Sequence, residues 1–154
     1  MKKYTIIAHT GILNTKAIEK ICTKLGIDKI PDPIEDVVGH RDDDGKLDFS
    51  FLDIEDGKGK LIITTSDNII RQINLSILRG SLEKLGCKIP SKCESIKSID
   101  YLEVEAFFIN KKGVLKKIKV TETGLYIPEF EEYINEMKDM MEAMFFMYSS
   151  FISI

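Results

Sequence analysis

Several features that define classes of protein are missing from this sequence. The three cysteines, Cys22, Cys87 and Cys93, are an odd number and include no Cys-x-x-Cys pair, so the sequence predicts neither a disulfide framework nor a structural zinc site. The 22 basic and 25 acidic residues give a net charge of −3, which disfavours a protein that wraps nucleic acid through bulk charge. We therefore expect reduced cysteines, no metal or cofactor, and a partner other than nucleic acid.

Long uninterrupted hydrophobic segments are missing as well. The N-terminal residues MKKYTIIAHTG include polar residues within a few positions, so no export segment is expected. The apolar run near the C-terminus is short and is interrupted by Lys138, Asp139 and Glu142, whereas a helix that spans a bilayer needs about 20 predominantly apolar residues. We expect a cytoplasmic protein with no membrane partner.

The composition that is present predicts a single folded domain, residues 1–154. Hydrophobic residues make up 44% of the 154 residues and charged residues 31%, which is close to the average for globular proteins. A domain of this length buries about 70% of the surface that its unfolded chain exposes, so it can form a hydrophobic core without disulfides or metals.

Hydrophobic periodicity and turn residues predict an α/β (α+β) domain in which helices pack on a mixed sheet. Strands are expected where apolar residues run together or alternate, and helices where they recur every three or four residues. Gly26 and Gly86 are expected to end two of the helices, and Gly80 inside a helix predicts a kink or a close contact. The expected order is βαββαββα, with strands at residues 3–10, 47–51, 60–65, 101–110 and 114–120 and helices at 14–25, 67–85 and from 129 onward.

A weak internal repeat relates residues 4–31 to residues 60–90. Both segments contain an apolar strand, a polar loop, a helix, Lys-Leu-Gly and Ile-Pro, which predicts a duplicated βα unit, although similar strands and helices also arise by chance. Two topologies stay open. A ferredoxin-like sheet, with helices on one face, would place loops 9–14 and 64–68 at opposite ends, whereas a doubly wound sheet would place them side by side.

A candidate ligand site lies at the ends of the first and middle strands. In residues 61–74 a β-rich run leads through Thr-Thr-Ser-Asp directly into a helix, and the N-terminus of a helix attracts anions. His9 could act as an acid or base near neutral pH, but no Ser, Cys or Asp stands at a known spacing from it, and a structural histidine is favoured over a catalytic one. The candidate ligand-binding residues are His9, Thr10, Gly11, Thr64, Thr65, Ser66 and Asp67.

Two segments carry a likeness to a known family, LIITTSDNIIRQINLSILRGSLEKLG and YLEVEAFFINKKGVLKKIKVTETGLYIPEFEEYINEM. They lie within residues 61–144, a region that resembles the C-terminal part of the ATPase lobe in RecF- and OLD-type relatives of the ABC ATPases. These relatives often act in DNA repair or phage defence, so the resemblance implies such a context. It also implies that Thr64 and Thr65 lie at the strand end and that Ser66 and Asp67 lie in the switch loop. Arg71 and Asn74 would lie on the helix behind that loop.

The parts that perform catalysis in that family have no counterpart in this chain. Thr65 is followed directly by Ser66, where the family has a switch histidine, and no Gly-x-x-x-x-Gly-Lys-Ser/Thr loop occurs. No Walker B strand with paired acids precedes Leu61, because the acids of FSFLDIED are expected at a hairpin turn. Phosphoryl transfer needs these groups together, so no catalytic residue is predicted.

The C-terminal helix, residues 129–154, has apolar residues on more than one face, whereas a surface helix needs only one apolar stripe. Flexible methionines with aromatic anchors suit an adaptable contact surface. This helix either packs back on the core of its own chain or contacts a protein partner or a second copy in a homo-oligomer. The candidate interface residues are Met137, Met140, Met141, Met144, Phe145, Met147, Tyr148 and Phe151.

These observations favour a non-catalytic interaction or regulatory module related to part of a RecF- or OLD-type ATPase. The alternative is a domain that binds a small ligand or nucleotide through the two strand-end loops, and an enzyme built on the solitary His9 ranks third. A lysine-rich hairpin at residues 111–119 could contact nucleic acid, but lysines also protect exposed sheet edges, and that interpretation is favoured.

Overall fold

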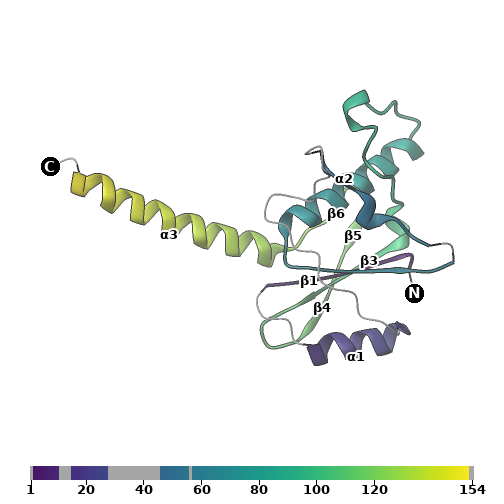
Figure 1. Ribbon diagram of the computed structural model, residues 1–154, viewed down its shortest axis with the longest axis horizontal. Helices are drawn as coiled ribbons and strands as arrows, with labels where there is room; N and C mark the ends of the chain where they lie inside the picture. Colours follow the sequence, from purple (N-terminus) through teal and green to yellow (C-terminus); the bar gives the residue numbers. More distant parts are fainter. Residues whose placement is uncertain (1, 11–14, 28–45, 56, 153–154) are drawn as a thin grey trace.

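The strand order of the sheet decides between the two topologies that the sequence leaves open. The computed structural model describes residues 2–10, 15–27, 46–55 and 57–152 (Figure 1). Its main sheet has the order β2-β1-β3-β4. β1 is parallel to both β2 and β3, and β4 is antiparallel to β3. The strands are β1 at Tyr4–His9, β2 at Lys60–Thr64, β3 at Val104–Ile109 and β4 at Leu115–Ile118.

The helices confirm the α/β class and exclude the ferredoxin-like alternative. α1 at Thr15–Leu25 and α2 at Asp67–Lys84 cover opposite faces of the sheet (Figure 1). The chain moves outward from β1 to β2 and then returns past β1 to β3, so right-handed crossovers in the two directions place the helices on opposite faces. A ferredoxin-like sheet would have both helices on one face, so the structure selects the other of the two open topologies, the doubly wound sheet.

Side-chain alternation along β1 creates a separate core on each face of the sheet. Residues level with one another across the sheet, such as Ile6, Ile62 and Ala106, face α2 and join its buried isoleucines. The next residues along the strands face α1, where the buried cluster comprises Ile7, Ile18, Ile21, Cys22, Leu61, Ile63 and Ile109. β1 is therefore covered on both faces, as is usual for a strand inside a parallel sheet.

The expected strand at residues 47–51 is wrong. Ser50–Leu52 form a 3₁₀ turn, which begins where the backbone N–H of Ser50 donates to Asp48 Oδ1 at 2.8 Å. Phe49, Phe51 and Leu52 are all buried, so the apolar residues do not alternate between two faces as they would in a strand. A local turn made by the Asp48 side chain therefore replaces the predicted pairing.

Two further strand boundaries differ from the expectation. Tyr101–Glu103 form a 3₁₀ turn before β3, and the run expected at 114–120 divides into β4 and the first strand of a small hairpin, β5 at Val120–Thr121 with β6 at Gly124–Leu125. The turn predicted at residues 111–113 does join β3 to antiparallel β4. The last element is α3, Pro128–Ile152.

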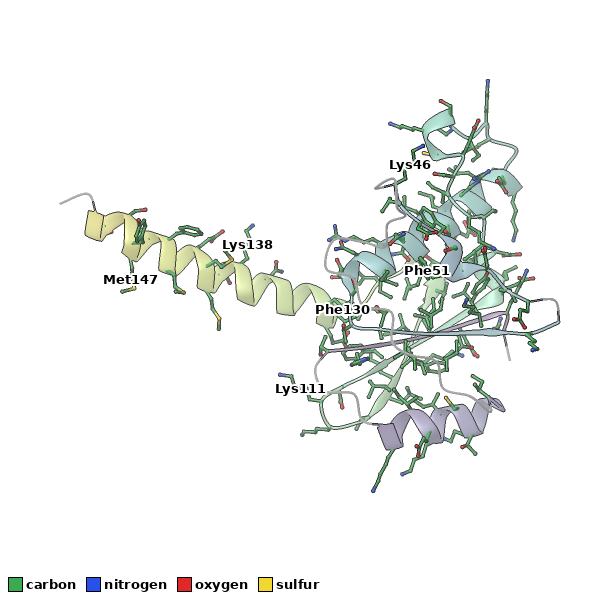
Figure 2. All side chains as sticks on the ribbon, in the orientation of Figure 1. Lys46, Phe51, Lys111, Phe130, Lys138 and Met147 are labelled. Atoms are coloured by element: carbon green, nitrogen blue, oxygen red, sulfur yellow. The ribbon has the colours of Figure 1, made fainter. Side chains whose placement is uncertain are left out.

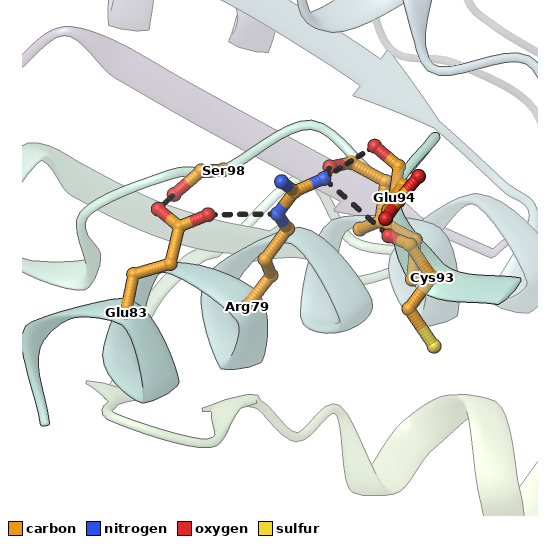
Figure 3. Close-up of polar contacts among 6 residues, drawn as sticks. Arg79, Glu83, Cys93, Glu94 and Ser98 are labelled. Atoms are coloured by element: carbon orange, nitrogen blue, oxygen red, sulfur yellow. Dashed lines mark hydrogen bonds and ion pairs between the residues drawn. The ribbon is translucent and has the colours of Figure 1, made fainter. Parts of the chain in front are cut away.

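The connection from α2 to β3 is held by one arginine (Figure 3). Arg79 Nη1 donates to the carbonyl oxygens of Glu94, at 2.6 Å, Cys93 and Ile96, and its Nε donates to Glu83 Oε1 at 2.8 Å. A planar guanidinium has several donors in fixed positions, so one side chain satisfies several carbonyls of an irregular segment.

The same connection crosses α2 at Gly80, where the sequence predicts a kink or a close contact. The backbone N–H of Ile99 donates to the carbonyl of Ser76 at 3.1 Å, and a Cβ added to Gly80 would lie 2.1 Å from the carbonyl oxygen of Ile99. The close contact is confirmed, and it involves backbone atoms that cannot move aside as a flexible side chain would.

Gly80→Ala tests whether this contact outweighs helix propensity. In an exposed helix the change would stabilise by about 1 kcal/mol, but here we expect a loss of about 3 kcal/mol, at the upper end for overpacking, because the added methyl meets backbone. Urea unfolding measures the change. Arg71→Ala on the exposed side of the same helix is the control, and a Gly80→Ala protein as stable as that control would contradict the contact.

The contact between Arg79 and Glu83 also predicts a change of stability with pH. Hydrogen bonds from Arg79 and then Ser98 hold the pKa of the Glu83 carboxyl below its usual value. Because the folded-state pKa is lowered, the ionised carboxylate stabilises the fold above the unfolded pKa of about 4.3, and this contribution is lost as the pH falls through the folded-state pKa.

Glu83→Gln should therefore have a lower melting temperature than the wild type at pH 7. The difference between the two melting temperatures should become smaller near pH 3. Thermal unfolding followed by circular dichroism across this range measures both proteins, with Glu19→Gln on α1 as the control. Parallel curves for Glu83→Gln and wild type would show that the carboxylate does not contribute.

Candidate functional site

The topology brings the ends of β1 and β2 to one edge of the sheet. The two strands are parallel and pair in register from Tyr4 with Lys60 to Ala8 with Thr64. His9 is the last residue of β1 and Thr64 the last of β2. A site shared by the two strand ends requires this arrangement, and in α/β folds ligands bind at the carboxyl edge of the sheet.

The side chains of His9 and Thr64 nevertheless lie on opposite faces of that edge. His9 follows the alternation of Ile7, which faces α1, whereas Thr64 follows Ile62, which faces α2. Both are buried, with 4% of His9 and none of Thr64 exposed. The two side chains therefore do not converge on one ligand from the same side of the sheet.

The remaining residues of this candidate site serve the start of α2. Thr64 Oγ1 accepts a hydrogen bond from the Ser66 N–H at 3.0 Å, and Ser66 Oγ accepts one from the Ile69 N–H at 3.4 Å, which is an N-cap. Asp67 Oδ2 pairs with Arg71 Nε at 2.7 Å. Thr10 and Thr65 are half-buried, and Gly11 lies outside the described residues. Local structure accounts for the polar groups of Thr64, Ser66 and Asp67, and the binding of a ligand by the candidate residues stays a prediction.

Asn74, which the family resemblance places behind the switch loop, has a structural contact. Its side-chain amide donates from Nδ2 to the Leu125 carbonyl at 2.9 Å and accepts from the Leu125 N–H at 2.8 Å, as a neighbouring strand would. A Cβ on Gly124 would lie 2.3 Å from Asn74 Oδ1. Asn74 thus fixes β6, immediately before the chain enters α3.

α3 is the second candidate site and the most unusual feature of the molecule. Its 25 residues extend over about 37 Å at 1.5 Å per residue, and the helix runs away from the sheet with its C-terminal end far from the body (Figure 1). Every residue from 138 to 150 is exposed. We call residues 137–152 the stem. The interpretation that this helix packs back on its own core is wrong for the described stem residues.

The stem exposes large apolar side chains that an ordinary surface helix would bury. Lys138 and Met147 both lie well out from the body (Figure 2). The side chains of Met137 and Phe151 lie outside the described part of the structure. The exposed fractions of the other predicted interface residues, in order along the chain, are Met140 58%, Met141 55%, Met144 71%, Phe145 63%, Met147 72% and Tyr148 63%, and Phe146 joins them at 75%.

The root of α3, in contrast, is fixed to the body, and the sequence interpretation did not identify it. Phe130 is only 4% exposed and meets Phe108 edge to face, with ring centroids 6.2 Å apart (Figure 2). Glu129 Oε1 pairs with Lys116 Nζ at 3.2 Å. Pro128 occupies the first helical position, which Pro favours. The sequence Ile-Pro-Glu-Phe carries these signals, but it does not show that residues 138–150 are exposed.

Other parts of the described surface are weaker candidates for a functional site. A groove of about 660 Å³ beside β4 is lined by Lys116, Lys117, Lys119 and Tyr126 among others, but Lys116 is engaged with Glu129. No three metal-ligating side chains come together among the described residues. None of the described helices is long and apolar enough to cross a membrane.

Comparisons with known proteins do not add to this geometry. No protein-family model, no curated protein and no solved structure matches the chain. The candidate sites are therefore judged on their own residues.

Two phenylalanines of α3 test the division between root and stem. Phe130→Ala should lower the free energy of unfolding by about 3–5 kcal/mol, since it leaves a cavity in the core. Phe146→Ala should change it by less than about 0.5 kcal/mol, as for most surface substitutions. Urea unfolding at low protein concentration measures both. A large loss on Phe146→Ala would show that the stem packs on the body.

Proposed function

We propose that this protein is a non-catalytic protein-interaction module whose contact element is the stem of α3. The observation that carries the proposal is a helix that is exposed from residue 138 to residue 150 while presenting Met140, Met144 and Met147 to solvent. Contiguous exposed apolar surface on a soluble domain marks an interaction site. A second copy of the chain is the partner to test first.

The energetics of the stem favour a partner. Burying one large apolar side chain contributes about 1.5–3 kcal/mol, and the described stem exposes seven of them, four methionines and three aromatic residues. When most of them are covered together, their sum reaches or exceeds the cost of association, which is about 4–15 kcal/mol. A partner must therefore present a long apolar surface, such as another helix.

The charges on the stem favour a protein surface over a lipid surface. Helices that lie on membranes carry Lys and Arg on the polar face, which attract anionic lipids. Between residues 138 and 150 the charged residues are Lys138, Asp139 and Glu142, with acidic residues in excess. Anionic lipid would repel this polar face.

The wider context stays a hypothesis. The likeness of residues 61–144 to RecF- and OLD-type ATPases motivates the idea that this module acts beside a complete ATPase, in DNA repair or phage defence. The chain has no phosphate-binding loop of its own, which agrees with a non-catalytic role.

A second candidate function is the binding of a small ligand or nucleotide at the carboxyl edge of the sheet. The observation in its favour is the parallel pairing of β1 with β2, which brings both strand ends to that edge. A bound ligand at 100 times its dissociation constant would stabilise the fold by about 2.7 kcal/mol, which a thermal-shift assay detects.

Light scattering tests the leading proposal. The full chain should have the mass of a dimer or larger assembly, and a chain ending at Glu136 should be a monomer with the same melting transition, because the described side chains of the stem, residues 138–150, are all exposed. ATP with magnesium should change neither mass. Both measurements use purified protein over a range of concentrations.

A full chain that stays monomeric at every concentration would contradict the proposal. An assembly that persists after truncation would place the contact on the body instead. A melting temperature that rises with ATP and magnesium would favour the second candidate function.

A further inference from the structure

The apolar residues of the stem repeat with the spacing of a coiled coil. From Met137 they recur at alternating steps of three and four, at Met140, Met144, Met147 and Phe151. A step pattern of 3.5 residues keeps one row facing a partner helix. Met141 and Tyr148 widen this row on one side, one residue after Met140 and Met147. All of these residues that the structure describes are more than half exposed.

This row is symmetric about Met144. Apolar residues stand three, four and seven positions before it, at Met141, Met140 and Met137, and three, four and seven positions after it, at Met147, Tyr148 and Phe151. A second stem reversed about Met144 would present the same row in the same register. Surfaces that match a rotated copy of themselves form two-fold symmetric dimers.

The charged residues of α3 are distributed unevenly along the same helix. One half is acidic and the other uncharged: six acids and one lysine precede Ala143, and no charged residue lies from Ala143 to Ile152, the charged residues being Glu129, Glu131, Glu132, Glu136, Lys138, Asp139 and Glu142. A parallel, in-register pair would set each carboxylate level with its own copy. A reversed pair sets the acidic half of one helix against the uncharged half of the other.

Reversal of the second stem about Met144 also places each charged residue of the stem level with an uncharged residue of the other copy. Asp139 and Glu142 would lie level with Ser149 and Phe146 of the second copy, and Lys138 would lie level with Ser150. No like charges meet in this arrangement. The helix dipoles run in opposite directions, so the negative end of each helix lies toward the positive end of the other.

We infer that two copies of this chain pair through their stems in antiparallel orientation, with Met144 facing Met144 across the two-fold axis. In this dimer Met140 lies level with Tyr148 and Met141 with Met147. The two bodies then lie at opposite ends of the paired stems. This inference rests on the proposed function and adds the partner, its orientation and its register.

Cysteine cross-linking in the full chain tests the orientation. Cys87 and Cys93, the two cysteines that are not buried, are first changed to Ser, and this background alone is the control. Disulfides need Cβ atoms within about 4.5 Å. Met144→Cys should then form a covalent dimer with itself under mild oxidation. Met140→Cys should form one with Tyr148→Cys but not with itself, because its copy lies about 12 Å away along the axis at 1.5 Å per residue.

A charge placed at the axis tests the same register without cross-linking. Met144→Glu should convert the assembly to monomers in light scattering, since two carboxylates would face each other in an apolar contact. Ser150→Glu adds the same charge about 120° around the helix, level with Lys138 of the second copy, and should leave the mass unchanged. Equal dissociation by both variants would overturn the register.

The outcomes separate this inference from the proposed function. If the full chain associates and the truncated chain does not, but Met140→Cys cross-links with itself, the stems are parallel, and the proposed function stands without the antiparallel pairing. If neither the full chain nor any variant associates, both are overturned.

Discussion

β1 is the strand on which the rest of the structure depends. It is hydrogen-bonded to a parallel strand on each side, and all six of its residues are buried. Its two faces contribute to two separate cores, one under α1 and one under α2. The hydroxyl group of buried Thr5 is satisfied inside the sheet, where Oγ1 donates to Glu105 Oε1 at 3.1 Å. β1 therefore positions β2 and β3, which pair with it, and the two helices that cover its faces.

α2 organises the irregular segments around that centre. Its polar side chains reach backbone groups in three separate parts of the chain: Gln72 donates to Asp48 at 3.1 Å, Asn74 binds both backbone groups of Leu125, and Arg79 binds the turn before β3. Buried backbone groups outside helices and strands need such partners. One helix therefore fixes the approach to β2, the entry to β3 and the hairpin that leads to α3.

The sequence predicts the elements of this fold where a local pattern determines them. The strands from Tyr4 and Lys60, the helix stop at Gly86 and the close approach at Gly80 all follow from periodicity and glycine chemistry. The strand order does not, because both topologies use the same local patterns and differ only in which distant strands pair. Likewise, the strand expected near Phe49 fails because the Asp48 turn competes locally with it. At the candidate site the residues at the sheet edge are placed together by topology, which the sequence alone leaves open.

The composition of the stem has a chemical consequence of its own. Five of the six methionines in the chain lie in α3, and the four with described side chains are 55–72% exposed. Oxidants convert an exposed thioether to a sulfoxide, which is polar and resists burial in an apolar contact. In the body, the thiol of Cys22 is buried inside the α1 core, whereas Cys87 is exposed and Cys93 is half-buried. Oxidation of the stem would therefore alter the surface through which we propose that the protein associates, while the core of the fold that carries this surface stays intact.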